Sequence, residues 1–373
     1  MVFKVEMKVV LRIAVLFFIG LTVSNVGFSA ENTPTLNWGG RIQADTTFFK
    51  NDKYTYEDGS EVRRGRLYIR GNLSRDWEYR IQYDFAPDDP ELKDGYVRYN
   101  GFRNTRITFG HFKQFSSLEE LISSNNITFT ERSLPNALVT SRRIGVGFQR
   151  WNKNYSFAAS AYSNEANNSS KGEGMAGRLA YRPRIGDGQL FHLGVNFSKE
   201  DDEDEIARFR ARPESHQDSY RIVDTNEILG VENRLKLGLE AAFVRGRFSV
   251  QSEYVQQKLK RSFETDVAFD GYYVYVSYFL TDDTRPYSDI DAAFGTVSPN
   301  NSGGAWEVAA RVSHLDLSDR NIPGGSVDSF TIGANYYMTR DLRFAANYVM
   351  TDSDRLAGND DPEIFQFRVR YTF

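Results

Sequence analysis

The 373-residue chain contains no cysteine and, after its N-terminal segment, no apolar run as long as a membrane-spanning helix. The missing cysteine excludes disulfides, thiolate metal ligands and a cysteine nucleophile. The net charge is only −4, so no bulk positive charge indicates nucleic-acid binding. The four histidines are scattered, and no GxSxG, HExxH, Walker or dinucleotide-binding motif is present. The sequence therefore predicts no catalytic residue, metal site, cofactor or nucleic-acid partner.

The N-terminal segment has the pattern of a secretory signal peptide. A basic start precedes an apolar run over 13–21, which is too short to span a bilayer. Small residues at Ser29 and Ala30 then offer a cleavage site. We expect a signal peptide over 1–30 and a mature domain over 31–373; an uncleaved N-terminal membrane anchor is the alternative.

Within the last eleven residues, the side chains alternate strictly between two kinds from Phe365 on. Apolar or aromatic residues occupy every second position from Phe365 to Phe373, and polar or basic residues fill the gaps. Because a strand points successive side chains to opposite faces, one face is apolar and the other polar. Strands of an outer-membrane barrel have this pattern, with lipid on one side and a water-filled lumen on the other. Tyr371 and Phe373 are expected to form a C-terminal membrane-insertion signal.

The same alternation recurs along the chain and predicts an all-β fold, a transmembrane antiparallel β-barrel of about sixteen strands. The 21 tyrosines and 28 phenylalanines suit the aromatic girdles of such a barrel. A soluble β-sandwich is the alternative, although its strands are seldom so long. The long connection 282–304, on the periplasmic side, fits this topology least well. Strands are expected over 36–49, 61–73, 77–88, 92–102, 106–114, 142–151, 155–164, 174–184, 189–200, 232–245, 247–261, 266–281, 305–318, 326–339, 342–353 and 363–373.

Arginines recur on the face that should line the lumen. If Leu67 and Ile69 face lipid, Arg64 faces inward, because an arginine at the bilayer midplane costs about 2–4 kcal/mol. Arg63 then faces outward unless a β-bulge turns both arginines inward. Guanidinium groups stay charged and bind phosphate or carboxylate at two points, so a row of them forms a chain of weak anion sites. Acidic residues on a facing wall would neutralise that row, as in a general pore.

The connection 115–141 carries more apolar side chains than an exposed loop should hold. Its start has a Ser-x-x-Glu capping box at Ser117 and Glu120, which predicts a short helix. Folding this loop into the barrel would bury its apolar groups and narrow the pore. Packing of the loop on a neighbouring subunit is the alternative.

The connection 201–231 carries three arginines spaced by two, which point the same way in an extended backbone. They are Arg208, Arg210 and Arg212. The acidic run 200–205 beside them is expected to be a solvated loop, and a divalent-cation site near lipopolysaccharide is its alternative.

Several of these segments together resemble the phosphate-selective porin family, the porin O/P family. The resemblance extends over essentially the whole mature chain. It is most specific in the loop and weaker in the strands. Its motifs are the stretches 110–114, 117–121, 123–125, 127–129 and 131–137 of the loop, and 40–45, 63–64, 77–84 and 272–281 of the strands.

The resemblance implies a homotrimer of sixteen-stranded barrels, each with a constriction formed by strand arginines, an inward loop and an arginine ladder. The departure is Glu120, where phosphate-selective members carry a lysine, so an anion porin is better supported than a strict phosphate porin. Residue by residue, the matches are Arg63 and Arg64 to the constriction pair, Ser123 and Ser124 to the anion-binding loop serines, Arg41 to a ladder position, and Arg208, Arg210 and Arg212 to the arginines of the long loop.

The sequence thus predicts an exported outer-membrane porin, a passive diffusion channel biased toward anions such as phosphate. Its expected partners are inorganic anions, outer-membrane lipid and lipopolysaccharide, the barrel assembly machinery and further copies of itself in a homotrimer. One alternative is a general or sugar-type porin, in which Tyr68 and Tyr337 would line a slide for the sugar. The other is a barrel that does not transport, such as an adhesin or a membrane-embedded enzyme.

Overall fold

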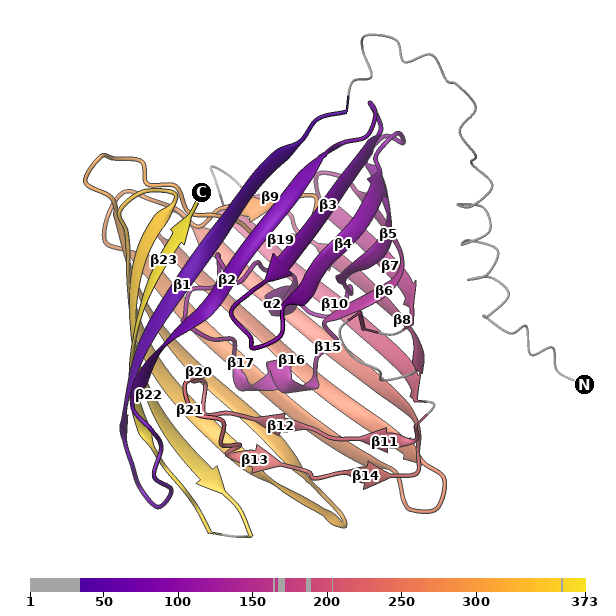
Figure 1. Cartoon of the computed structure of the whole chain (residues 1–373), viewed down its shortest axis with the longest axis vertical. Helices are drawn as coiled ribbons and strands as arrows, with labels where there is room; N and C mark the ends of the chain where they lie inside the picture. The colour runs from indigo at the N-terminus through magenta and orange to yellow at the C-terminus, as the bar shows by residue number, and fades with distance from the viewer. Residues whose placement is uncertain (1–33, 164, 167–171, 186–188, 203, 357) are drawn as a thin grey trace, which may run out of the picture.

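The structure, a computed structural model, describes residues 34–373 apart from 164, 167–171, 186–188, 203 and 357. The signal peptide expected over 1–30 lies outside these residues. Sixteen long antiparallel strands in the described part form one sheet, and pairing of the last strand with the first closes it into a barrel (Figure 1). The predicted sixteen-stranded barrel is therefore confirmed.

Each barrel strand pairs with its neighbours in the chain, and the expected bounds agree with the observed ones to within about four residues. The strands are β1 (Asn37–Lys50), β2 (Gly59–Asn72), β3 (Trp77–Asp84), β4 (Glu91–Tyr99), β5 (Thr105–Lys113), β6 (Arg142–Trp151), β7 (Tyr155–Tyr162), β8 (Gly172–Tyr181), β10 (Gln189–Asp202), β15 (Val231–Arg245), β16 (Phe248–Arg261), β17 (Val267–Phe279), β20 (Ala305–Asp319), β21 (Ile322–Tyr337), β22 (Leu342–Asp354) and β23 (Glu363–Thr372).

Side chains alternate between the outside of the barrel and its lumen. On β21, Phe330 and Ile332 are exposed outside, while Ser329 and Thr331 are buried inside. Apolar groups on the outer face are stable in contact with hydrocarbon, and polar groups inside can bind one another and water. Of the helices in the described part of the chain, none has the length and apolar character needed to traverse a bilayer.

Short turns join strands at the end of the barrel where the C-terminus lies, which we call the periplasmic end (Figure 1). The turn between β15 and β16 has only two residues, Gly246 and Arg247, and Gly246 adopts a φ of 55°. Glycine has no Cβ and tolerates this left-handed conformation, which matches the twist of a tight hairpin.

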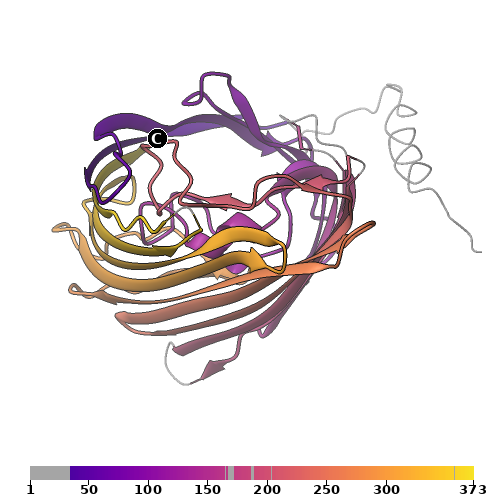
Figure 2. The ribbon, with the colours of Figure 1, turned by 90° about the horizontal axis from the view of Figure 1, so that it is seen from below.

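Three connections fold into the lumen. The view into the barrel shows the purple one and the pink one inside the ring of strands (Figure 2). The constriction loop is residues 114–141, the outer loop is 204–230, and the periplasmic segment is 280–304. A further short strand, β9 (Arg184–Ile185), lies at the edge of β10. The short elements of the three connections are α2 (Leu118–Leu121), η2 (Leu134–Leu138), β11 (Ile206–Ala207), β12 (Arg210–Ala211), β13 (Val223–Asp224), β14 (Ile228–Leu229), β18 (Tyr287–Ser288) and β19 (Ala293–Phe294).

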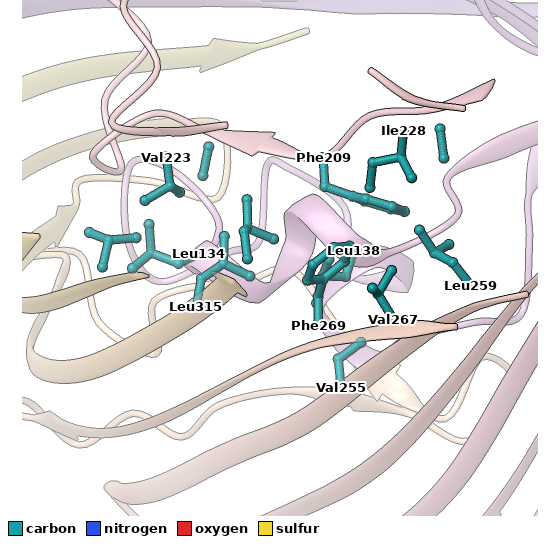
Figure 3. Packing of buried hydrophobic residues seen from close by; sticks show 14 of the residues in the cluster. Leu134, Leu138, Phe209, Val223, Ile228, Val255, Leu259, Val267, Phe269 and Leu315 are labelled. Atoms are coloured by element: carbon teal, nitrogen blue, oxygen red, sulfur yellow. The ribbon is translucent and has the colours of Figure 1, made fainter. Parts of the chain in front are cut away.

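Apolar packing holds the constriction loop between the other two connections. On its outer side, Leu134 and Leu138 of η2 pack with Phe209 and Ile228 of the outer loop against wall residues that include Leu315 (Figure 3). Burial of each large aliphatic side chain contributes about 1.5–3 kcal/mol. The expected inward folding of this loop is confirmed, and its apolar groups need no neighbouring subunit to cover them.

The periplasmic segment packs under the other side of the constriction loop, which the sequence did not suggest. Ala293 and Phe294 of β19 lie in one buried cluster with Leu118, Ile122 and Ile127. The Thr296 hydroxyl also donates to Asn126 Oδ1 at 3.0 Å. The loop therefore rests on a layer supplied from the periplasmic end.

Candidate functional site

A cavity of about 780 Å³ lies in the lumen between the constriction loop and the wall formed by β1 to β6. The wall residues are there because the strand alternation turns polar side chains inward. Acidic residues in the lining are few: Glu78, Asp94 and Asp291. Basic residues are more than three times as many, and they are Arg41, Arg64, Arg66, Arg70, Arg80, Arg98, Arg106, Lys113, Arg132 and Arg142.

At the edge of this cavity, β1 meets the constriction loop through Arg41. Its Nη1 and Nη2 donate to Ser123 Oγ at 3.3 Å and to Ser124 Oγ at 2.8 Å. Gln43 supports the same stretch by donating to the Ser124 carbonyl at 3.1 Å. Within the described residues, Arg41 forms no ion pair and its buried Nε has no hydrogen-bond partner. The structure thus brings together Arg41, Ser123 and Ser124, which were matched from the sequence. The two hydroxyl groups do not neutralise the positive charge of the Arg41 guanidinium.

A β-bulge on β2 turns Arg63 and Arg64 inward together. Gln43 pairs with Arg64 and the next residue, Ala44, pairs with Val62, so Arg63 is the extra residue of the bulge. A bulge places two residues opposite one on the partner strand and re-aims their side chains. The bulge expected at this pair is present, and it allows two successive arginines to avoid the lipid face.

Both arginines contact Glu131 of the constriction loop, a partner that the sequence did not identify. Arg63 Nε and Nη2 donate to the two carboxylate oxygens at 2.8 and 3.0 Å, and Arg64 Nη2 lies 3.4 Å from Oε2. A third guanidinium, that of Arg368 on β23, donates to Oε1 at 2.8 Å. Only the inward fold of the loop makes this cluster, so the spacing along the chain carries no signal of it.

The outer loop presents its arginines as the spacing predicts. Arg208 and Arg210 are exposed and Arg212 half-buried, while Phe209 between them is buried in the apolar cluster. Arg208 binds Asp224 through two hydrogen bonds of 2.8 and 2.6 Å. Extended backbone therefore buries one side of this segment and presents the guanidinium groups on the other side.

Arg221, which the sequence did not single out, joins this group. Burial, followed by the charges of Arg212 and Arg210, lowers its pKa to about 10. Burial and the charge of Arg63 likewise lower the pKa of Arg212. Arg212 therefore lies near basic side chains both in the outer loop and in the bulged pair.

Glu120, the position that departs from the family pattern, is buried among cations. Its carboxylate lies 3.3 Å from Arg132 Nε and 3.7 Å from Lys113 Nζ, and it accepts from Ser141 Oγ at 2.7 Å. The capping box is half formed, since Ser117 Oγ accepts from the Glu120 backbone N–H at 3.1 Å. The glutamate thus neutralises two cavity-lining cations without presenting a free negative charge.

The acidic run 200–205 is not a wholly solvated loop. Glu200 is a buried wall residue that lies 2.8 Å from Arg234 and 3.9 Å from Arg143. Residue 203 lies outside the described residues. Across the described ranges, no group of three histidines or carboxylates is arranged to hold a metal ion.

The C-terminus completes the barrel. Gly40 N–H donates to the Phe373 carbonyl at 2.9 Å, and Phe373 N–H donates back at 3.1 Å. The Phe373 ring meets Trp38 edge-on with centroids 5.9 Å apart, and Tyr371 is half exposed on the outer surface. The last residues therefore seal the β1–β23 seam beside the lipid-facing side.

A closed sixteen-stranded barrel with an apolar outer surface, whose polar lumen is narrowed by an inward loop, is the architecture of an outer-membrane porin. The chain belongs to the family described as phosphate-selective porin O and P, which matches residues 36–373. The protein accordingly resides in the bacterial outer membrane. Both family and fold are those of a channel.

Similar proteins support the same family and fold. The chain is 28% identical over 387 aligned positions to Porin O of Pseudomonas aeruginosa, covering 90% of this chain and 87% of that one. OmpT of Vibrio cholerae has a TM-score of 0.61 at 12% identity, covering 93% of this chain and 99% of that one. An anion-selective porin from Comamonas acidovorans has a TM-score of 0.60 at 12% identity, covering 91% and 100%. At such identities the two solved structures show the fold alone.

Proposed function

We propose that this porin is a passive diffusion channel that prefers anions such as phosphate. The observation that carries the proposal is the excess of basic over acidic side chains around the cavity. Two unit charges 4 Å apart attract by about 1 kcal/mol in bulk water and about 4 kcal/mol at an effective dielectric constant of 20. A row of such sites attracts an anion without trapping it, which is what conduction requires.

The path follows the basic residues from outside to inside. Arg208, Arg210 and Arg212 recruit anions at the outer loop. The pair Arg63 and Arg64 then passes them to a site formed by Arg41, Ser123 and Ser124. The descriptions of the family as phosphate-selective and of the Comamonas porin as anion-selective agree with this preference.

Three further properties belong to the same proposal. Assembly as a homotrimer rests on the family resemblance, and export through a signal peptide over 1–30 rests on the N-terminal residue pattern. Insertion by the barrel assembly machinery, which would recognise Tyr371 and Phe373, rests on the alternation at the C-terminus. The partners of the outer surface are then membrane lipid and lipopolysaccharide.

Reversal potentials in planar bilayers under a KCl gradient test the anion preference. The wild type should be anion-selective, and Arg64→Glu should shift the permeability ratio toward cations by about tenfold or more, because it reverses one charge at the constriction. Arg247→Glu makes the same change in an exposed periplasmic turn and should leave the ratio unchanged.

Two results would contradict the proposal. Cation preference of the wild type would reject it outright, and an unchanged ratio in Arg64→Glu would remove that residue from the selective site. Block of chloride current by an oligosaccharide but not by phosphate would favour a sugar-type porin. The absence of any conductance would favour a barrel that does not transport.

A further inference from the structure

Three guanidinium groups converge on one carboxylate at the constriction. Glu131 binds Arg63 at two points and contacts Arg64 and Arg368 at 3.4 and 2.8 Å. The two oxygens of a carboxylate fit the fork of a guanidinium in the same way as two oxygens of a phosphate. The chain therefore places its own anion where a permeating anion would be expected to bind.

Anchoring of the loop does not depend on this carboxylate. The backbone carbonyls of Ile127 and Thr128 accept from Arg343, and the carbonyl of Glu131 itself accepts from Arg311 Nη1 at 3.1 Å. The Thr130 carbonyl accepts from Arg368. After position 131, the Leu134 N–H donates to Ser313 Oγ at 2.9 Å. The main chain thus holds the loop on both sides of position 131, so anchoring does not require the Glu131 side chain.

Exposure separates Glu131 from the structural carboxylates of the lumen. Its side chain and that of Arg63 retain 15% and 18% of their accessible surface, whereas those of Glu240 and Arg178, a buried pair in the wall, retain 0% and 3%. An entering anion can reach the Glu131 cluster, and Arg212 of the outer loop lies close enough to Arg63 to interact with it electrostatically.

We propose that Glu131 is a tethered competitor for the permeating anion. Resting on the proposed anion preference, this role gives Glu131 control over how tightly the constriction holds its solute. The carboxylate occupies Arg63 and Arg64 between passages, an oxyanion displaces it by making the same two-point contact, and its return expels the anion. Affinity stays low and transit stays fast because the site is never left without a counter-charge.

The test compares Glu131→Gln with the wild type in planar bilayers, with inorganic phosphate as the probe. The half-saturating phosphate concentration for block of chloride current should fall about tenfold or more, because one negative charge within about 4 Å of the binding groups is removed. Blocked intervals in single-channel records should lengthen by a similar factor.

Glu307→Gln is the matched control. Glu307 is a buried lumenal carboxylate that accepts hydrogen bonds from Asn335 and Tyr337 and, among the described residues, forms no ion pair. This variant removes one lumenal charge by the same substitution and should leave phosphate block unchanged. An equal tightening in both variants would show a general charge effect and would overturn the proposal.

A double-mutant cycle with Arg63→Gln decides between competition and a supporting role. If Glu131 competes at Arg63, Glu131→Gln should tighten phosphate block much less in the Arg63→Gln background. If Glu131 only supports the loop, Glu131→Gln should raise the conductance for anions and cations alike and leave the half-saturating phosphate concentration unchanged. That result would overturn the proposal. The wild-type reversal potential tests the anion preference separately, so an unchanged half-saturation in an anion-selective channel rejects the role of Glu131 alone.

Discussion

Arginines on the β20–β23 wall bind the constriction loop, whereas those on the β1–β6 wall mostly face the cavity. Arg343 on β22 donates to the Ile127 carbonyl at 2.7 Å and also to that of Thr128. On the β1–β6 wall, Arg80 and Arg70 lie over the ring of Tyr68 at 4.5 and 5.3 Å from its centroid and line the cavity. Arginines therefore donate hydrogen bonds to the constriction loop on the β20–β23 wall, which we call the loop-bearing wall. They line the cavity on the β1–β6 wall, which we call the open wall.

The apolar face of the loop decides which wall is which. Phe129 packs edge-on against Tyr275 with centroids 5.5 Å apart, and Arg311 lies 4.4 Å above the Phe129 ring. Once these contacts press the loop against one wall, its carbonyls are buried and need donors. Leaving a buried acceptor unpaired costs about 1–3 kcal/mol, so arginines on that wall are committed to the loop. The arginines of the other wall line the cavity instead, several of them paired with carboxylates such as Asp94.

The largest effect is expected from Arg343→Met on the loop-bearing wall. This change leaves the Ile127 carbonyl without its arginine donor, at a cost of about 1–3 kcal/mol for a buried unpaired carbonyl, while the Thr128 carbonyl loses one donor and keeps Asn335 Nδ2 at 3.0 Å. The loop tip should leave the wall, so single-channel conductance should rise and the Tm of the barrel in detergent should fall. Both are measured on purified protein.

Arg70→Met is the matched variant on the open wall. Arg70 lies over Tyr68 and lines the cavity without contacting the loop in the described structure. Its Tm should equal that of the wild type. An Arg343→Met protein with wild-type Tm and conductance would show that the two walls do not differ in this way.

A smaller effect, on phosphate binding and not on stability, is expected from Arg41→Met. The change removes the donors that contact Ser123 and Ser124, and hydrogen bonds to charged groups contribute about 1.5–3 kcal/mol. Phosphate block of chloride current should weaken by about tenfold, while the Tm should change little because Gln43 still donates to the Ser124 carbonyl.

Arg370→Met sharpens this comparison. Arg370 on β23 donates to the Asn125 carbonyl at 2.6 Å and so holds the next residue of the same loop. We expect a lower Tm with phosphate affinity close to that of the wild type. Identical phenotypes for the two variants would mean that anchoring and solute binding cannot be assigned to separate arginines.

Alternation along the chain was sufficient to predict the barrel and the side on which each wall residue lies. It placed Arg64 in the lumen and indicated a bulge at Arg63, because lipid excludes a guanidinium group from the other face. It could not separate Arg41 from Arg343, since both have lumenal parity. Their difference arises from where the constriction loop packs, which depends on contacts between residues far apart in the chain.

The same limit explains what the sequence did not reveal about the site. Glu131 is an ordinary loop carboxylate until the fold brings it to β2 and β23. The periplasmic segment was expected only as a long connection, yet its Phe294 packs against the constriction loop from the periplasmic side. A period-two pattern describes strands well and says nothing about which loops meet inside the barrel.

The smallest effect is expected from Arg210→Gln in the outer loop, at the outer entrance of the proposed anion path. Arg210 is exposed, so it acts on entering anions through water. The Debye length is about 30 Å at 0.01 M salt and about 3 Å at 1 M, so its influence should be confined to dilute solution. Chloride conductance should fall about twofold at 0.01 M KCl, on the order of 0.4 kcal/mol, and should match the wild type at 1 M.

Arg75→Gln removes one exposed charge from a turn at the periplasmic end and controls for net charge. If both variants lower conductance equally when anions enter from the outer side, recruitment depends on overall charge rather than on the outer loop. If only Arg210→Gln does so, and only at low salt, the outer loop feeds the open wall. That wall then works as one graded path, with screened charges at the entrance and partly buried charges at the constriction, where salt screens them far less.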